Sequence, residues 1–160
     1  MRFFTDSNFI IALNNPRESD RNKKANEILK RLNKYGLIRN KFELVITNLI
    51  LAEVMNLILK KRTLPAAKRI FQEIISNFQI IEVSDIKINK ESFEQYCCQY
   101  WNPSGRTLGL TDGITLFIMR SKGIGLLLSF EEAFDSIAGI RRLSEPDEIE
   151  ELIPGGNRNK

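Results

Sequence analysis

The sequence carries acidic residues in positions that favour a shared chemical site. Four stand out: Asp6, Glu53, Asp112 and Glu131. Clustered carboxylates repel one another, so such a group persists either by holding protons or by binding cations. Ligation by oxygen alone favours Mg²⁺ or Mn²⁺, and ions held in this way can activate water for phosphodiester cleavage. If the fold brings the four together, these residue types predict metal-dependent hydrolysis.

The chain contains no histidine. This excludes a histidine general base, Ser-His-Asp and Cys-His arrangements, and zinc sites with histidine ligands. The two cysteines, Cys97 and Cys98, are adjacent, which suits neither a disulfide framework nor a zinc site built from spaced thiolates. Any hydrolysis must therefore use carboxylates, lysines or a metal ion.

Short apolar segments alternate with helical patterns along the chain. This order predicts an α/β fold with a mostly parallel sheet, because parallel neighbours need crossover connections. The predicted strands are residues 2–5, 44–46, 78–83, 124–129 and 140–143. The predicted helices are residues 9–13, 21–35, 48–62, 65–77, 86–100 and 112–123, with a helical turn at 132–134. Gly36 is the expected stop of one helix, and Thr47 and Thr111 are expected N-caps.

The four acids fall close to one edge of this predicted sheet. In parallel sheets, ligands bind beyond the carboxyl ends of the strands. Asp6 and Glu131 each follow a predicted strand, so both are expected at that edge. Glu53 and Asp112 fall in the first two turns of helices that follow crossovers. The sequence therefore predicts that all four side chains converge there.

Each acid also has a purely structural interpretation. Asp112 in a first helical turn is, judged singly, more often a favourable partner for the helix dipole, and Asp6 could simply initiate a turn. Glu53 is more informative, because a charge in the nearly apolar segment 51–55 usually needs a partner. Spacing alone does not rank Glu131 against Asp135, which stays a substitute candidate for the fourth acid.

Composition fits one domain of a globular protein with an anionic partner. The net charge is +4 and the pI is near 9.1, and no apolar run approaches the roughly 18 residues of a membrane span. The N-terminus lacks the pattern of a signal peptide, so cytoplasmic residence is expected. The basic residues between Arg21 and Arg39 could follow RNA phosphates or could form a solvated face. Arg106 is a further candidate for a substrate contact.

Four short motifs, in this order, resemble the PIN-domain family of metal-dependent nucleases, especially its VapC-like toxins. The first is Phe4-Thr5-Asp6-Ser7-Asn8, and the second is the helix segment Leu51-Ala52-Glu53-Val54-Met55-Asn56. The third is Leu110-Thr111-Asp112-Gly113-Ile114-Thr115, with a hydroxyl three positions after its acid. The fourth is Leu128-Ser129-Phe130-Glu131-Glu132-Ala133-Phe134, where the family more often has Asp than Glu.

The resemblance implies a specific fold and site. The fold would be a three-layer α/β/α domain over residues 1–153, with a sheet of four to five strands; the sequence itself predicts a flexible tail at 154–160. Asp6, Glu53 and Asp112 would bind a catalytic Mg²⁺ or Mn²⁺, and Glu131 would support a second or water-bridged ion. Asn8, Thr115 and Ser129 would orient the carboxylates, although capping and turn hydrogen bonds are an equal alternative for them.

The same resemblance implies the activity and the partners. The protein would be an endoribonuclease that cleaves RNA by a metal-activated water, as the toxin of a type II toxin–antitoxin pair. It would form a homodimer and bind an antitoxin. Two alternatives remain: a nuclease that processes RNA without being a toxin, and a non-catalytic module that binds RNA or protein. Residues 112–116 also superficially resemble the nucleophile loop of haloacid-dehalogenase phosphatases, but the required second Asp and preceding strand are missing.

Overall fold

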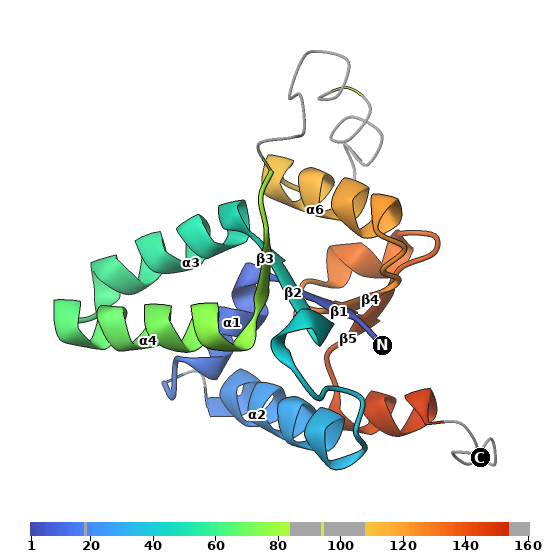
Figure 1. Ribbon diagram of the computed structural model, residues 1–160, viewed down its shortest axis with the longest axis horizontal. Helices are drawn as coiled ribbons and strands as arrows, with labels where there is room; N and C mark the ends of the chain where they lie inside the picture. The colour runs from blue at the N-terminus through green and yellow to red at the C-terminus, as the bar shows by residue number, and fades with distance from the viewer. Residues whose placement is uncertain (18, 84–93, 95–107, 154–160) are drawn as a thin grey trace.

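The computed structural model describes residues 1–17, 19–83, 94 and 108–153 of the chain, and its centre is a five-stranded sheet (Figure 1). Every strand is parallel to its neighbours, in the order β3-β2-β1-β4-β5. The strands are β1 (Phe3–Thr5), β2 (Leu44–Thr47), β3 (Gln79–Ile81), β4 (Leu126–Leu128) and β5 (Arg141–Leu143). The predicted parallel α/β sheet is confirmed.

Helices cover both faces of the sheet and complete three layers. One layer holds α1 (Ser7–Leu13), α2 (Ser19–Lys34), α3 (Asn48–Lys61) and α4 (Leu64–Asn77). The other holds α6 (Leu110–Ser121) and the 3-10 helix η3 (Glu132–Ser136). This division follows from right-handed crossovers, because the chain moves from β1 to β3 in one direction and then returns past β1 to β4. Two further 3-10 helices are η1 (Lys41–Glu43) and η4 (Pro146–Leu152), and η4 packs against α2.

The strand register aligns the carboxyl ends of the strands. Thr5 pairs with Leu128, and Thr47 pairs with Ile81. The residues that follow these strands therefore meet at a single edge of the sheet. Two N-caps at this edge also start helices: Asp6 caps α1, and the Thr47 hydroxyl accepts a hydrogen bond of 3.2 Å from the Ile50 N–H to cap α3.

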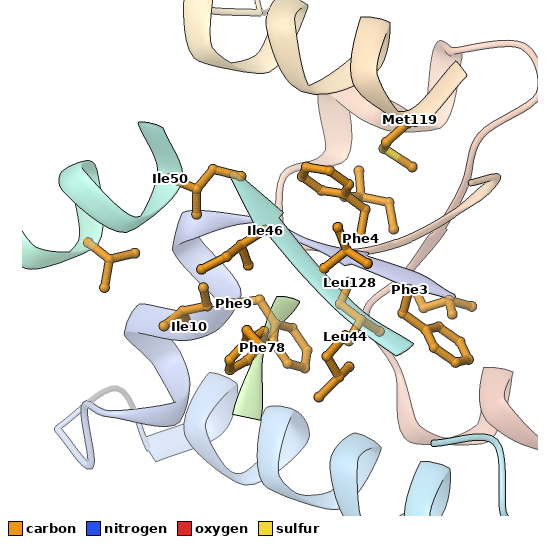
Figure 2. Packing of buried hydrophobic residues seen from close by; sticks show 14 of the residues in the cluster. Phe3, Phe4, Phe9, Ile10, Leu44, Ile46, Ile50, Phe78, Met119 and Leu128 are labelled. Carbon is orange, nitrogen blue, oxygen red and sulfur yellow. The ribbon is translucent and has the colours of Figure 1, made fainter. Parts of the chain in front are cut away.

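The core lies between the sheet and its helices and contains mainly aromatic and β-branched residues (Figure 2). Phe3 and Phe4 point to opposite faces of the buried β1, as successive strand residues must, and both are fully buried. Phe9 and Ile10 from α1 are also fully buried. This packing fixes β1 and α1 against each other, and so fixes the direction of the turn at Asp6 between them.

Most predicted elements are confirmed within one to three residues, with two corrections. The predicted N-cap Thr111 is wrong: α6 begins at Leu110 and Gly109 is its N-cap. The 3-10 helices η1 and η4 were not predicted, and the acidic sequence of η4 has Ile149 as its one fully buried residue. The predicted helix at 86–100, the loop with Arg106, the pair Cys97-Cys98 and the tail at 154–160 lie outside the described residues. In the described part of the chain, no helix has the length and apolar character needed to span a membrane.

Candidate active site

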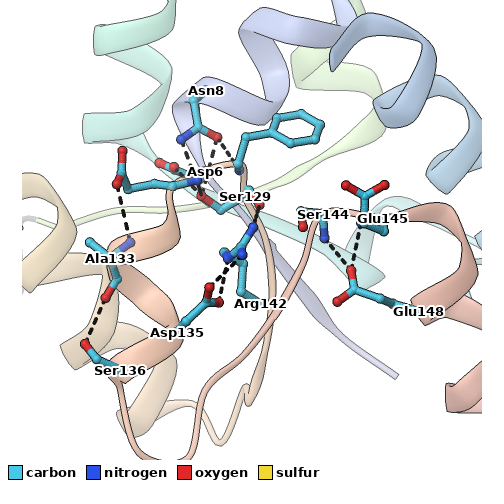
Figure 3. Close-up of polar contacts among 12 residues, drawn as sticks. Asp6, Asn8, Ser129, Ala133, Asp135, Ser136, Arg142, Ser144, Glu145 and Glu148 are labelled. Carbon is cyan, nitrogen blue, oxygen red and sulfur yellow. Dashed lines mark hydrogen bonds and ion pairs between the residues drawn. The ribbon is translucent and has the colours of Figure 1, made fainter. Parts of the chain in front are cut away.

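Asp6 is the buried centre of the candidate site. It follows β1 directly, and its side chain is 6% exposed. Its Oδ1 accepts a hydrogen bond of 2.7 Å from the Ser7 N–H, and its Oδ2 accepts one of 2.9 Å from the Ser129 hydroxyl (Figure 3). Asp6 does lie in the turn it was expected to initiate and caps α1, yet this local role does not explain why a carboxylate is buried among other acids.

Burial and neighbouring acids raise the pKa of Asp6 from its ordinary value of 3.8 to about 7. Loss of hydration is the largest cause, followed by repulsion from Asp112, with a smaller contribution from Glu53. The hydrogen bonds from Ser129 and Ser7 act in the opposite direction and do not compensate. An ionised Asp6 is thus costly unless a positive charge is supplied to it.

Asp112 approaches the same place from the first turn of α6. Its Oδ2 accepts a hydrogen bond of 2.8 Å from the Gly109 N–H, which closes the helix N-terminus. Burial raises the pKa of Asp112, and the charges of Glu53 and Glu131 raise it further. Asp112, like Asp6, combines a capping role with a position in a field of negative charge.

Glu53 and Glu131 complete this field from the flanking elements. Glu53 lies in the second turn of α3, on its exposed side, and its charge acts on both Asp6 and Asp112. Glu131 caps η3 through a hydrogen bond of 3.3 Å from the Ala133 N–H to its Oε1. The four predicted acids lie at or near the N-terminal ends of α1, α3, α6 and η3 and share one electrostatic environment, named here the carboxylate cluster.

The chemistry of the carboxylate cluster suits a divalent cation. Its donors are all oxygen, they belong to four separate elements, and their mutual repulsion falls when a cation lies among them. Across the described residues, no three acidic side chains are already grouped as ligands of a single ion. Coordination by three of these acids therefore requires side-chain rotation, which an exposed side chain such as that of Glu53 readily undergoes.

Ser129 and Asn8 hold the buried part of the carboxylate cluster in place. The Ser129 hydroxyl donates to Asp6 and accepts a hydrogen bond of 3.0 Å from the Glu131 N–H, so it joins two of the acids. The Asn8 Oδ1 accepts a hydrogen bond of 3.0 Å from the Phe130 N–H, which ties α1 to the turn after β4. Thr115 is buried on α6 but forms no hydrogen bond with any of the four acids in the described structure.

Asp135, the alternative fourth acid, has a different partner. Its two oxygens accept hydrogen bonds of 2.7 Å each from Arg142 Nε and Nη2, and this guanidinium lowers the pKa of Asp135. Its negative charge is thereby compensated, whereas Glu131 acts on Asp112. The geometry favours Glu131 as the fourth acid. Arg106, the predicted substrate contact, lies outside the described residues.

Sequence reasoning did not identify two groups that shape the site. The Ser7 N–H contributes the shortest hydrogen bond to Asp6, and the Gly109 N–H binds Asp112. A polar residue directly after an acid and a glycine three positions before one are the signals that could have pointed to them, since both are common at helix N-termini.

Comparison with known proteins shows the family and supports the fold. The family model described as "PIN domain" matches residues 3–140. Among solved structures, the chain is similar to Mycobacterium tuberculosis VapC20, a Sarcin-Ricin loop cleaving toxin, with a TM-score of 0.60 and 21% identity. That alignment covers 87% of this chain and 98% of VapC20. No curated protein matches the sequence. Because the family model extends over most of the chain, the protein belongs to the PIN-domain family.

Proposed function

We propose that this protein is a metal-dependent endoribonuclease whose active site is the carboxylate cluster. The observation that carries the proposal is the burial of Asp6 beside Asp112 and Glu53, which raises the pKa of Asp6 to about 7. Such an arrangement is unfavourable for folding alone, so it favours a function that needs concentrated negative charge. Membership of the PIN-domain family supports the same conclusion.

Asp6, Glu53 and Asp112 would hold Mg²⁺ or Mn²⁺, with Glu131 supporting them. When bound, a divalent cation lowers the pKa of a water molecule and stabilises charge on phosphodiester oxygens. Ser129 and Asn8 would position the acids. Ser129 hydrogen-bonds to both the Asp6 carboxylate and the Glu131 backbone, and Asn8 fixes the turn that carries Glu131. Without histidine, acid–base steps would have to use water or the carboxylates themselves.

RNA cleavage by purified protein tests this proposal. Labelled single-stranded and hairpin RNAs, including a Sarcin-Ricin loop hairpin, would be incubated with Mg²⁺ or Mn²⁺ and separated on denaturing gels. Wild type and Glu73→Gln should cleave equally, because Glu73 lies on α4 away from the carboxylate cluster, whereas Asp6→Asn should be inactive. Equal cleavage by wild type and Asp6→Asn would refute the proposed mechanism.

The toxin role is the finer part of the proposal. It is supported by the resemblance to VapC-like toxins and by the shared fold with VapC20. In that role the protein would form a homodimer, and an antitoxin would suppress its activity. Expression in bacteria should arrest growth for wild type but not for Asp6→Asn. Cleavage in vitro without growth arrest would instead favour an RNA-processing nuclease.

A further inference from the structure

A second charged region lies at the far ends of α1 and α3, in a pocket of about 420 Å³. Three cationic residues line it: Arg17, Lys61 and Arg62. Its apolar lining includes Ile11 and Leu57, and none of the described lining residues is acidic. We name these three cations and the cavity between them the basic pocket.

The cations of the basic pocket differ from two cations that line a cavity elsewhere in the molecule, Lys24 and Arg142. Lys24 pairs with Glu145, and Arg142 pairs with Asp135. By contrast, within the described ranges no carboxylate forms an ion pair with Arg17, Lys61 or Arg62. Among the described residues, Arg62 donates to two neutral oxygens, with Nη2 distances of 3.4 Å to the Asn14 carbonyl and 3.3 Å to Asn15 Oδ1. The positive charge of the basic pocket is therefore available to an anionic ligand.

The same two helices connect the basic pocket to the carboxylate cluster. Both α1 and α3 begin at the carboxyl edge of the sheet, where Asp6 caps α1 and Glu53 lies in the second turn of α3. They pack against each other, and the Arg62 hydrogen bonds join their far ends. Asn14 follows Asp6 by eight positions, so a helical rise of 1.5 Å per residue puts the basic pocket about 12 Å from the cluster.

We propose that the basic pocket binds backbone phosphates of an RNA strand a few nucleotides from the scissile bond. This inference rests on the proposed function, since it assumes RNA at the carboxylate cluster. The cluster repels a polyanion, so productive binding needs cations outside it that counter this repulsion. Arg17 and Lys61 meet that need on the surface beside α1 and α3, and the apolar lining offers contact to a ribose or a base. Phosphate contacts of this kind position the strand without reading its sequence.

Binding measured without catalysis tests the pocket separately from the chemistry. Fluorescence anisotropy of a labelled RNA of about 16 nucleotides, recorded in EDTA over a series of salt concentrations, would compare two double variants. The test variant is Arg17→Gln/Lys61→Gln. The control is Lys60→Gln/Lys68→Gln, which removes the same charge from exposed positions on α3 and α4 outside the basic pocket. Arg62 stays intact because it also joins the helices, and thermal melting verifies the fold of both variants.

The test variant should bind RNA about tenfold more weakly than the control at 0.1 M salt. The slope of log K against log salt concentration should be about 1.4 smaller in magnitude, because two contacts to a single strand are lost. Equal RNA affinity and equal salt slopes in the two variants would overturn the proposal. It would also be overturned if the test variant kept its RNA binding but lost binding of an acidic peptide.

Cleavage kinetics then separate failure of the pocket from failure of the proposed function. For the same RNA, the test variant should raise KM with kcat unchanged, whereas a dinucleotide too short to reach the basic pocket should be cleaved equally by both variants. Cleavage of the long RNA with the same KM in both variants would reject the pocket and leave the nuclease function standing. If wild type cleaves neither substrate, the nuclease function fails, and the binding comparison alone decides whether the pocket holds RNA.

Discussion

At the carboxyl edge of the sheet, acidic side chains lie close to one another, whereas along the contact between α2 and η4 acidic side chains form ion pairs with cations. In the second region, Arg31 Nη1 lies 2.7 Å from Asp147 Oδ1 and 3.1 Å from Glu150 Oε1, and Lys24 pairs with Glu145. The acids of these pairs are largely solvated, so the pairs add little stability but fix how η4 packs on α2. At the sheet edge, the buried Asp6 has no cation beside it in the described structure and faces Asp112 and Glu53 instead. Opposite charges at the surface are explained by packing, but like charges in a buried site need a function.

The largest difference between the two regions should appear in activity. Asp112→Asn removes one acid from the carboxylate cluster and should lower RNA cleavage about a thousandfold, because several kcal/mol of charge stabilisation depend on the set of acids. Asp147→Asn removes one acid from the α2–η4 contact and should leave cleavage unchanged. Single-turnover assays with Mn²⁺ measure both. Similar losses in the two variants would mean that the cluster has no special role.

The free energy of unfolding should depend on pH because of the carboxylate cluster, since an ionised Asp6 destabilises the folded protein. Folded Asp6 has a pKa of about 7 against 3.8, so between these values the folded protein binds more protons than the unfolded chain. The contribution of Asp6 to the free energy of unfolding therefore falls as pH rises from about 4 to 7, by up to about 4 kcal/mol, and stays low above pH 7. Urea unfolding of metal-free wild type and Asp6→Asn measures this contribution. The free energy of unfolding of the variant should increase relative to that of the wild type as pH rises. A constant difference between the two from pH 4 to pH 8 would contradict the raised pKa.

A smaller effect should distinguish the two candidates for the fourth acid. Glu131→Gln should reduce cleavage about tenfold to thirtyfold, since it removes a charge that acts on Asp112 but leaves the other three acids in place. Asp135→Asn weakens the ion pair with Arg142 and should change cleavage by less than about twofold. Rate measurements at saturating Mn²⁺ compare them. The reverse order of effects would make Asp135 the fourth acid.

The smallest effect belongs to the surface pairs. Arg31→Gln removes the cation shared by Glu27, Asp147 and Glu150, and should lower the Tm by about 1–3 °C. The shift should shrink in 1 M salt, where exposed charges are screened. Calorimetry at low and high salt measures it. A large, salt-independent loss would show that the α2–η4 contact is held by more than solvated charge.

Local patterns predicted the fold where the residue itself determines the structure. Thr47 is the predicted N-cap of α3, and Gly36 ends the helical region of α2 with a φ of 65°, a conformation that glycine adopts without strain. The prediction of Thr111 as an N-cap was wrong although a hydroxyl side chain suits that position. Asp112 accepts a hydrogen bond from the Gly109 N–H, so α6 starts earlier. The helix η4 could not be predicted, because its packing depends on cations of α2 more than a hundred residues away.

The candidate site shows the same division between local and distant information. The order of motifs and the expected edge of the sheet pointed to Asp6, Glu53, Asp112 and Glu131, which the fold does bring into one electrostatic environment. Spacing could not rank Glu131 against Asp135, because the ranking depends on where Arg142 of β5 lies. The basic surface of α2 was open to two interpretations for a similar reason: apart from Glu27, the acids that pair with Lys24 and Arg31 come from the far end of the chain.

Titration of Mn²⁺ into metal-free wild type and Asp6→Asn at pH 8, followed by isothermal calorimetry, tests most directly whether the buried acids form a divalent-cation site. The wild type should bind Mn²⁺ saturably and gain a higher Tm, and the variant should show no comparable binding. Equal Mn²⁺ binding by both proteins, or none by the wild type, would contradict it.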